Sequence, residues 1–217
     1  MSVVDDYLLS LPRKERPKGI LYVTDLTKPC LRSSYLNIVS PREYPVESQR
    51  VFESGRLIED WWVHVLMETP GIRVLGQQLP ARYVDGGLEI HGRIDALCLH
   101  DNRTLVCHEV KSAKSTAYTV EPKEEHLLQL QFYLGCMGLD WGQVDYLDKR
   151  VMLQGEGVSV EKCFTVERDP GMFAEVVRRG RELNEAVRMR VEPPAEKGWL
   201  CDYCLHREEC KGEAKLV

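Results

Sequence analysis

The sequence predicts an α/β fold, in which long helices alternate with groups of short strands. Between residues 47 and 67, apolar side chains recur at helical spacing, at Ile58, Trp61, Trp62 and Val65. From residue 72 onward the apolar runs become short, and turn residues such as Asp85-Gly86-Gly87 separate them. Hydrophobic residues make up 43% of the 217-residue chain, which is enough for a sizeable core. We therefore expect a single domain over residues 1–217.

Three parts of this domain differ in their motifs. Residues 1–46 form an N-terminal segment with one cysteine, residues 47–168 form the core, and residues 169–217 form a C-terminal helix and a cysteine tail. In the N-terminal segment, Thr24 is the expected N-cap of a helix that is interrupted near Pro29.

The elements of the core follow from periodicity and turn residues. After the helix at 47–67 we expect strands at about 72–84, 88–99 and 103–111. A helix at about 122–137 should end near Gly138, and strands at about 143–153 and 157–167 should follow. Asp169-Pro170 then predicts the start of a helix to about Val191, whose apolar side is Phe173, Val176, Val177, Leu183 and Val187.

Composition excludes several classes of protein. The formal net charge of -5 argues against a protein that coats nucleic acid by bulk electrostatics. No window approaches the roughly 18 consecutive apolar residues of a membrane helix, and we expect a soluble, cytoplasmic protein without a membrane partner. Four of the eight cysteines lie among apolar neighbours and are expected to fill the core: Cys98, Cys107, Cys136 and Cys163.

Three charged residues stand out within the apolar strands. Strand alternation places Glu109 and Lys111 on one face and His108 on the other, where we expect a structural role. A turn at Asp101-Asn102 would bring Asp95 alongside them. Two carboxylates and an ammonium on one face are suited to bind Mg2+ or Mn2+ and to stabilise charge on a phosphate. The alternative is a surface hairpin with a Glu-Lys ion pair worth under about 1 kcal/mol.

Two polar residues on the following helix could complete this group. Gln129 and Tyr133 are four positions apart, so they share one helical face and offer an amide and a phenol to Lys111 or to a phosphate. The alternative is that Tyr133 is a core aromatic residue.

The cysteine tail has the spacing of a metal site. Cys201, Cys204 and Cys210 lie within ten residues, in CDYCLHREEC, and a fourth ligand must come from elsewhere. Cys30 is the candidate, and His206 could replace it in a zinc site.

The combined motifs resemble a known family. GRID, EVK and QLQFY resemble the core of the PD-(D/E)XK nucleases, and among them the RecB-like nuclease domains. An early cysteine with a C-terminal Cys-x2-Cys-x5-Cys is similar to the iron-sulfur members of that group. VTDLTKPCLRSSYL resembles the N-terminal segment of the CRISPR-associated RecB-like family, which acts in spacer acquisition.

The resemblance implies a fold and a set of site residues. It implies a mixed central sheet flanked by helices, with the two terminal segments joined by an iron-sulfur cluster on Cys30, Cys201, Cys204 and Cys210, a 4Fe-4S rather than a 2Fe-2S cluster. It further implies that Mg2+ or Mn2+ is held by Asp95, Glu109, the Val110 carbonyl and a residue of the helix at 47–67. That residue is Glu59 by its spacing from Gly55, with His64 as the alternative.

The resemblance also implies a function. It predicts a metal-dependent DNA exonuclease for single-stranded DNA or overhangs, acting in CRISPR prespacer processing with CRISPR integrase proteins as partners. One alternative is a repair or recombination nuclease like those of RecB and AddB, and another is a non-catalytic iron-sulfur DNA-binding subunit. The sequence is compatible with a homo-oligomer.

Overall fold

The structure is a computed structural model that describes residues 2–12, 16–154 and 159–210. The elements of these residues are, in chain order, α1 (Val3–Ser10), β1 (Ile20–Tyr22), α2 (Val23–Leu26), α3 (Leu31–Val39), α4 (Val46–Glu68), β2 (Ile72–Asp85), β3 (Leu88–His100), β4 (Thr104–Ala113), α5 (Glu124–Met137), β5 (Trp141–Asp148), α6 (Lys149–Gln154), β6 (Glu161–Glu167), α7 (Pro170–Met189), the 3-10 helix η1 (Trp199–Tyr203) and α8 (Arg207–Cys210).

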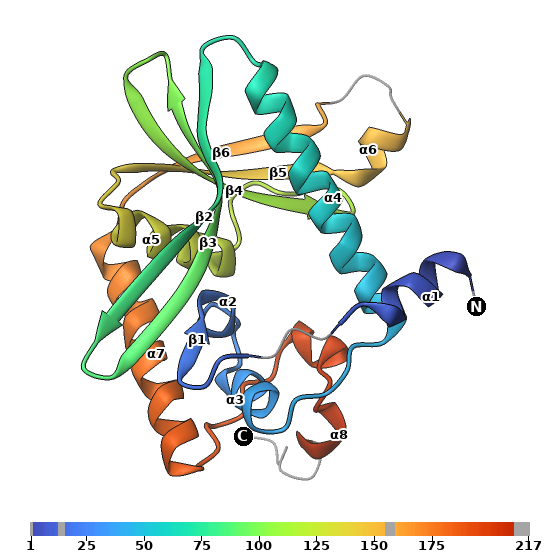
Figure 1. The fold of residues 1–217 in the computed structure, drawn as a ribbon, viewed down its shortest axis with the longest axis vertical. Coiled ribbons are helices and arrows are strands. Elements are labelled where there is room, and N and C mark those ends of the chain that lie inside the picture. The colour runs from blue at the N-terminus through green and yellow to red at the C-terminus, as the bar shows by residue number, and fades with distance from the viewer. Residues whose placement is uncertain (1, 13–15, 155–158, 211–217) are drawn as a thin grey trace.

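A mixed sheet organises the molecule (Figure 1). Its strand order is β1-β3-β4-β5-β6, and β2 pairs with the other edge of β3. β1 runs parallel to β3 and β4 runs parallel to β5, whereas the β2–β3, β3–β4 and β5–β6 pairs are antiparallel. This confirms the α/β prediction and the mixed sheet that the resemblance implies.

β4 separates from β3 beyond the Ala96–His108 pair, and we call this opening the fork. β1 pairs with Glu89–His91 of β3, and β4 pairs on the same edge only with 96–100. The residues between these stretches, 92–95, have no partner strand on that edge within the described part of the chain. β4 therefore continues past Glu109 beside β5 alone, and its backbone groups on this side are free for side chains.

Helices cover both faces of the sheet. On one face, α4 packs Trp62, Val63 and Leu66 against a set of strand residues, Ala96, Cys98, Val110 and Leu147. On the other face, α5 packs a second apolar cluster against strand residues that include Cys107 and Val144. We call these surfaces of the sheet the α4 face and the α5 face. α7 packs on the outer side of α5 and also contacts α3 (Figure 1).

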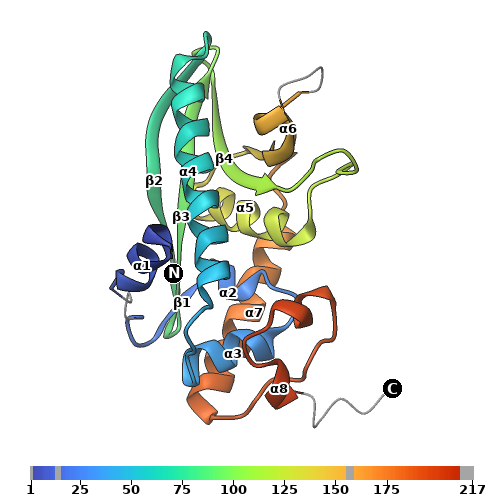
Figure 2. The ribbon, with the colours of Figure 1, turned by 90° about the vertical axis from the view of Figure 1, so that its right-hand side faces the viewer.

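The segment around α3 and the C-terminal segment around α8 lie side by side, as Figure 2 shows. The Arg32 side chain donates to the Pro193 carbonyl at 2.7 Å, and Arg42 donates to the Leu205 carbonyl at 3.0 Å. None of the helices in the described ranges is long and apolar enough to span a lipid bilayer.

Most predicted elements are present, with shifted ends. The interruption near Pro29 is confirmed, because α2 ends at Leu26 and α3 begins at Leu31. Thr24 as N-cap is wrong: α2 already begins at Val23, and Asp25 accepts a hydrogen bond from the Tyr22 backbone N–H at 3.0 Å. The sequence reading also missed α1, β1, η1 and α8.

The strand expected at 143–153 is partly wrong. β5 ends at Asp148, and α6 follows at once. The Asp148 carboxylate accepts hydrogen bonds from the backbone N–H groups of Arg150 and Val151, at 2.9 and 3.0 Å, and so starts a helix where the apolar pattern continued. The next strand begins at Glu161 rather than 157, and positions 157 and 158 lie outside the described residues.

Two burial predictions are also wrong. Trp61 is 42% exposed, because the buried stripe of α4 runs through Trp62, Val63 and Leu66 instead. Cys163 is exposed, since it lies on β6 at the edge of the sheet, whereas Cys98 and Cys107 are fully buried as expected.

Candidate active site

The fork between β3 and β4 brings Asp95, Glu109 and Lys111 together. Asp95 is on the unpaired stretch of β3, and its Oδ2 accepts a hydrogen bond of 2.8 Å from the Val110 backbone N–H. The Asp95 carboxylate thus accepts a hydrogen bond from a backbone N–H that has no partner strand. This bond joins β3 to β4 where the two strands separate.

Glu109 is the buried centre of this group. Its side chain is fully buried, and Lys111 forms an ion pair with its Oε1. Both carboxylate oxygens otherwise lack a hydrogen bond within the described residues. Burial therefore raises the pKa of Glu109, although the Lys111 charge acts in the opposite direction. A fully buried carboxylate whose one polar partner among the described residues is a lysine is a costly feature that a bound cation would stabilise.

Asp95 and Glu59 add two more acids. Burial, and then the Glu109 charge, raise the pKa of Asp95 to about 7. Burial, and then the Asp95 charge, raise the pKa of Glu59 to about 8. With pKa values raised this far, the two neighbouring carboxyl groups bind protons at pH values where isolated carboxyl groups are ionised. Because three acids face one lysine, full ionisation of the acids would leave unbalanced negative charge at the site.

The structure separates the two alternatives on α4. Glu59 points at Asp95, and the Gln78 amide donates a hydrogen bond to Glu59. His64 is exposed and has no contact with the acids among the described residues. Sequence reasoning missed Gln78, whose φ of 53° turns its side chain toward α4; no sequence motif signals that backbone conformation.

Lys111 is held in its charged form. Burial acts to lower its pKa, but the charges of Glu109 and Asp95 outweigh this effect and raise the pKa. Its side chain remains 26% exposed, so part of it is open to solvent.

Gln129 and Tyr133 support the site from α5. The Gln129 amide donates to the Tyr133 hydroxyl at 2.8 Å, as their spacing of four residues allows. Tyr133 is 1% exposed and packs against Gly92, where an added Cβ would lie 2.5 Å from the tyrosine ring. The glycine of GRID is therefore required by this close approach.

These donors fit a hard divalent cation such as Mg2+ or Mn2+. Such ions select carboxylate and carbonyl oxygens, and Glu109 presents two buried oxygens whose one polar partner among the described residues is Lys111. Asp95 and Glu59 lie beside it with raised pKa values, which a cation would lower.

The comparisons with known proteins agree with this geometry. A family model described as the PD-(D/E)XK nuclease superfamily matches residues 24–211. The chain belongs to the PD-(D/E)XK nuclease superfamily. No curated protein sequence matches it.

Solved structures share the fold of this nuclease. The crystal structure of SSO0001 matches with a TM-score of 0.66 and 21% identity, over 99% of this chain and 94% of that one. An alkaline exonuclease from Laribacter hongkongensis matches with a TM-score of 0.57 and 18% identity, over 80% and 90% of the two chains. A phage-related exonuclease from Haemophilus somnus matches with a TM-score of 0.53 and 13% identity, over 74% and 80%.

The four cysteines of the predicted cluster come from both ends of the nuclease. Cys30 precedes α3, Cys201 lies in η1, and Cys204 and Cys210 flank the last turn of the described chain. The charges of Cys30 and Cys204 act on Cys210, whose pKa is raised by burial first and then by Cys204. Soft thiol donors from both termini fit an iron-sulfur cluster.

His206, the alternative ligand in a zinc site, makes other contacts in the structure. It is fully buried, and its two ring nitrogens lie 3.1 Å from Asn37 Oδ1 and from Glu209 Oε2. Both nitrogens are engaged in fastening the tail to α3.

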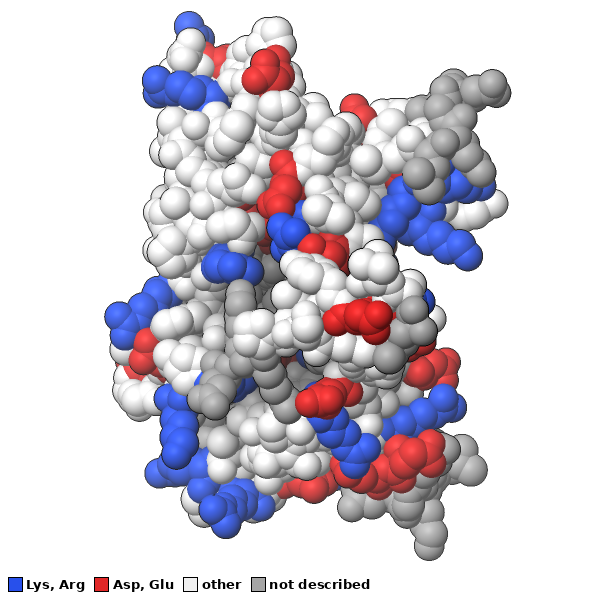
Figure 3. Space-filling model, turned by 45° about the vertical axis from the view of Figure 1, so that its right-hand side comes forward, with Lys and Arg blue, Asp and Glu red and all other residues white. Residues whose placement is uncertain are grey.

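No continuous basic surface covers the face of the molecule in Figure 3; lysines and arginines form separate groups there, interrupted by acids, among the described residues.

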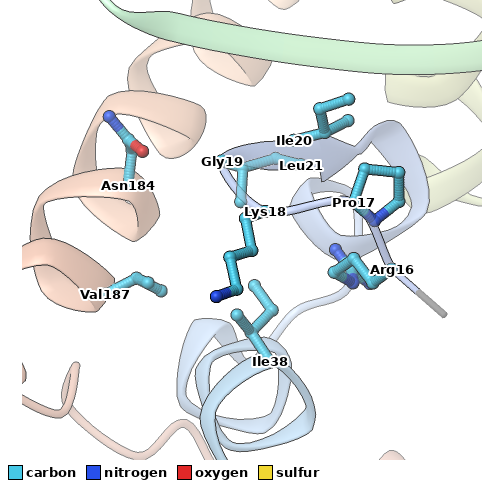
Figure 4. A pocket seen from close by; sticks show the side chains of 9 residues that line it. All are labelled: Arg16, Pro17, Lys18, Gly19, Ile20, Leu21, Ile38, Asn184 and Val187. Carbon is cyan, nitrogen blue, oxygen red and sulfur yellow. The ribbon is translucent and has the colours of Figure 1, made fainter.

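A small hollow of about 140 Å³ lies between β1, α3 and α7, with Lys18, Ile38 and Asn184 in its lining (Figure 4). None of the acids at the fork lines it, so it is separate from the nuclease site.

Proposed function

We propose that the protein is a cytoplasmic, metal-dependent DNA exonuclease that acts on single-stranded DNA or overhangs. The observation that carries the proposal is the fully buried Glu109 carboxylate, which lies beside Asp95 at the fork and whose one polar partner among the described residues is Lys111. The names of two structural neighbours, an alkaline exonuclease and a phage-related exonuclease, support exonuclease over endonuclease chemistry.

Each site residue has a proposed role. Asp95, Glu109, the Val110 carbonyl and Glu59 hold Mg2+ or Mn2+, which when bound supplies charge stabilisation and a more acidic water. Lys111 orients the attacking water and stabilises the charge that grows on the phosphate. Gln129 and Tyr133 are positioning residues, because Tyr133 is enclosed and its hydroxyl is bound by Gln129.

We infer that Cys30, Cys201, Cys204 and Cys210 hold an iron-sulfur cluster of the 4Fe-4S type. The proximity of Cys30, Cys204 and Cys210 supports this assignment.

The cluster would act as a cross-link between the N-terminal and C-terminal segments. Joining Cys30 to Cys201 closes a loop of about 170 residues, worth roughly 5 kcal/mol on the chain-entropy estimate. We expect Cys204→Ala to bleach the visible spectrum and lower the melting temperature, whereas Cys136→Ser on α5 leaves both unchanged. A Cys204→Ala variant with the spectrum and melting of the wild type would refute the cluster.

Prespacer trimming for CRISPR adaptation is the biological role we propose, with CRISPR integrase proteins as partners. It rests on the resemblance of the cysteine arrangement and of VTDLTKPCLRSSYL. The test is a duplex with single-stranded overhangs, incubated with the nuclease and with or without the integrase. Trimming to a fixed overhang length only when the integrase is present supports the role, and identical products in both reactions argue against it.

The nuclease activity itself is tested on end-labelled linear and closed circular single-stranded DNA. Wild type, Asp95→Asn and Lys111→Met are purified identically and assayed with Mn2+, Mg2+ or EDTA, with His64→Gln as the matched control on α4. We expect metal-dependent loss of the linear substrate alone, abolished in both site variants and kept in the control. Equal degradation by wild type and Asp95→Asn would reveal a contaminating nuclease and overturn the assignment.

A further inference from the structure

A second group of metal-ligating side chains lies behind the active site. Cys98 and His100 are on β3, and His108 is on β4, where it pairs with Ala96. Alternation along the strands places them on the α4 face, whereas Glu109 belongs to the α5 face. This group is therefore separated from the nuclease site by the sheet itself.

The three side chains converge on one point. The Cys98 sulfur and one nitrogen of each histidine all lie within 4.8 Å of one another, and the two Nε2 atoms are 3.0 Å apart. A tetrahedral zinc ion requires nitrogens about 3.3 Å apart, and sulfur about 3.6 Å from each nitrogen. Two facing imidazole nitrogens at this distance must share either a proton or an ion.

Asp145 orients His108 toward that point. Its Oδ2 lies 2.7 Å from His108 Nδ1 and also accepts a hydrogen bond from Trp62 Nε1 at 3.0 Å. The Gln143 amide donates to the other oxygen at 2.6 Å. This arrangement fixes a proton on Nδ1 and aims Nε2 at the cluster, where an ion would take the place of the Nε2 proton, as at histidines that bind zinc beside a carboxylate.

We propose that Cys98, His100 and His108 bind one divalent ion of the zinc class at a structural site distinct from the nuclease centre. One thiolate and two imidazoles select zinc over Mg2+ and Mn2+, which prefer oxygen ligands. Three protein ligands leave one coordination position for water. Cys98 and His108 are fully buried, and the half-buried His100 gives the ion access from solvent.

The site would stiffen the strands that carry catalysis. Asp95 is three residues before Cys98, and Glu109 directly follows His108. An ion that joins β3 to β4 on the α4 face would therefore hold the two strands together next to the point where they separate, on the face opposite Glu109. Binding releases the thiol proton and the proton between the imidazoles to solvent.

Cobalt binding tests this site, because tetrahedral Co2+ with a thiolate ligand has a visible spectrum. Wild type, Cys98→Ser and His100→Ala are treated anaerobically with a chelator and titrated with Co2+. The matched controls are Cys136→Ser on α5 and His64→Ala on the exposed side of α4. The tail cysteines are the same in all five proteins, so any difference reports on this site.

We expect both cluster variants to bind one equivalent of Co2+ fewer than wild type and to lose the corresponding absorption. The controls should keep it, and Zn2+ should displace the cobalt. His100 is half-buried, so His100→Ala keeps the test valid if Cys98→Ser does not fold. The same stoichiometry and spectrum in wild type and folded His100→Ala would overturn the proposal and leave a hydrogen-bonded packing cluster.

Discussion

The α5 face and the α4 face of the β3–β4 pair both bury polar groups, but they satisfy them differently. On the α5 face, the buried Glu109 carboxylate has Lys111 as its one polar partner among the described residues, and the pKa of Asp95 is raised to about 7 by burial and the Glu109 charge. On the α4 face, Asp145 accepts hydrogen bonds from His108, Trp62 and Gln143.

This difference separates a reactive site from a structural one. Buried polar groups in proteins are normally hydrogen-bonded, and a group without partners destabilises the fold. The α4 face follows that rule. Burial alone would lower the pKa of His108, but Asp145 outweighs this effect and the pKa is raised to about 9. The α5 face retains an unfavourable arrangement, which is expected where a cation and a phosphate must bind.

The largest expected effect is on catalysis. Glu109→Gln keeps the shape of the side chain but removes its charge, so we expect nuclease activity to fall by at least about 10³-fold. Initial rates on end-labelled DNA at saturating Mn2+ measure this, with Glu68→Gln at the exposed end of α4 as control. A loss below tenfold would mean that Glu109 is not a metal ligand.

The corresponding change on the α4 face should affect stability instead. Asp145→Ala leaves the His108, Trp62 and Gln143 donors buried without an acceptor, which we expect to cost about 3 kcal/mol of unfolding free energy. Denaturant titration measures the loss, and exposed Asp140→Ala should change it by less than about 0.5 kcal/mol. A neutral Asp145→Ala would remove the contrast between the faces.

A smaller effect is expected at Gly92. A Cβ there would lie 2.5 Å from the Tyr133 ring and 3.0 Å from Val23, so Gly92→Ala should destabilise the fold by about 1–3 kcal/mol. Gly198, with nothing within 4 Å of an added Cβ and an extended φ of −172°, is the matched control. Equal melting temperatures for the two variants would show that α5 is not in close contact with the fork.

The smallest expected effect is the pH dependence of the stability of the metal-free protein. Folding raises the pKa of Asp95 to about 7 and that of Glu59 to about 8, chiefly by burial. The folded state therefore binds protons that the unfolded state releases above about pH 4, and stability is lost as pH rises through 7 and 8. Melting temperatures in EDTA should fall between pH 5 and 8, less steeply in Glu59→Gln. A flat profile would contradict the raised pKa values of these two acids.

Much of this could be predicted from the sequence, for identifiable reasons. Strand period placed Glu109 and Lys111 together and His108 opposite, and helical period placed Gln129 beside Tyr133; the structure has these arrangements. Asp145 gave no signal, because one acid in an apolar strand does not reveal its partners on α4 and β4. Helix α6 was missed because the capping by Asp148 acts through backbone geometry that periodicity does not encode.

Thermal unfolding of wild type and Asp95→Asn at pH 8, in EDTA and in Mn2+, tests the central claim most directly. The α5 face is held in an unfavourable charge state for the sake of a cation, so Asp95→Asn should melt several degrees above wild type in EDTA. Mn2+ should stabilise wild type, by about 2.7 kcal/mol at 100 times its dissociation constant, and leave the variant unchanged. A variant that melts lower in EDTA and gains as much from Mn2+ as wild type would contradict the account.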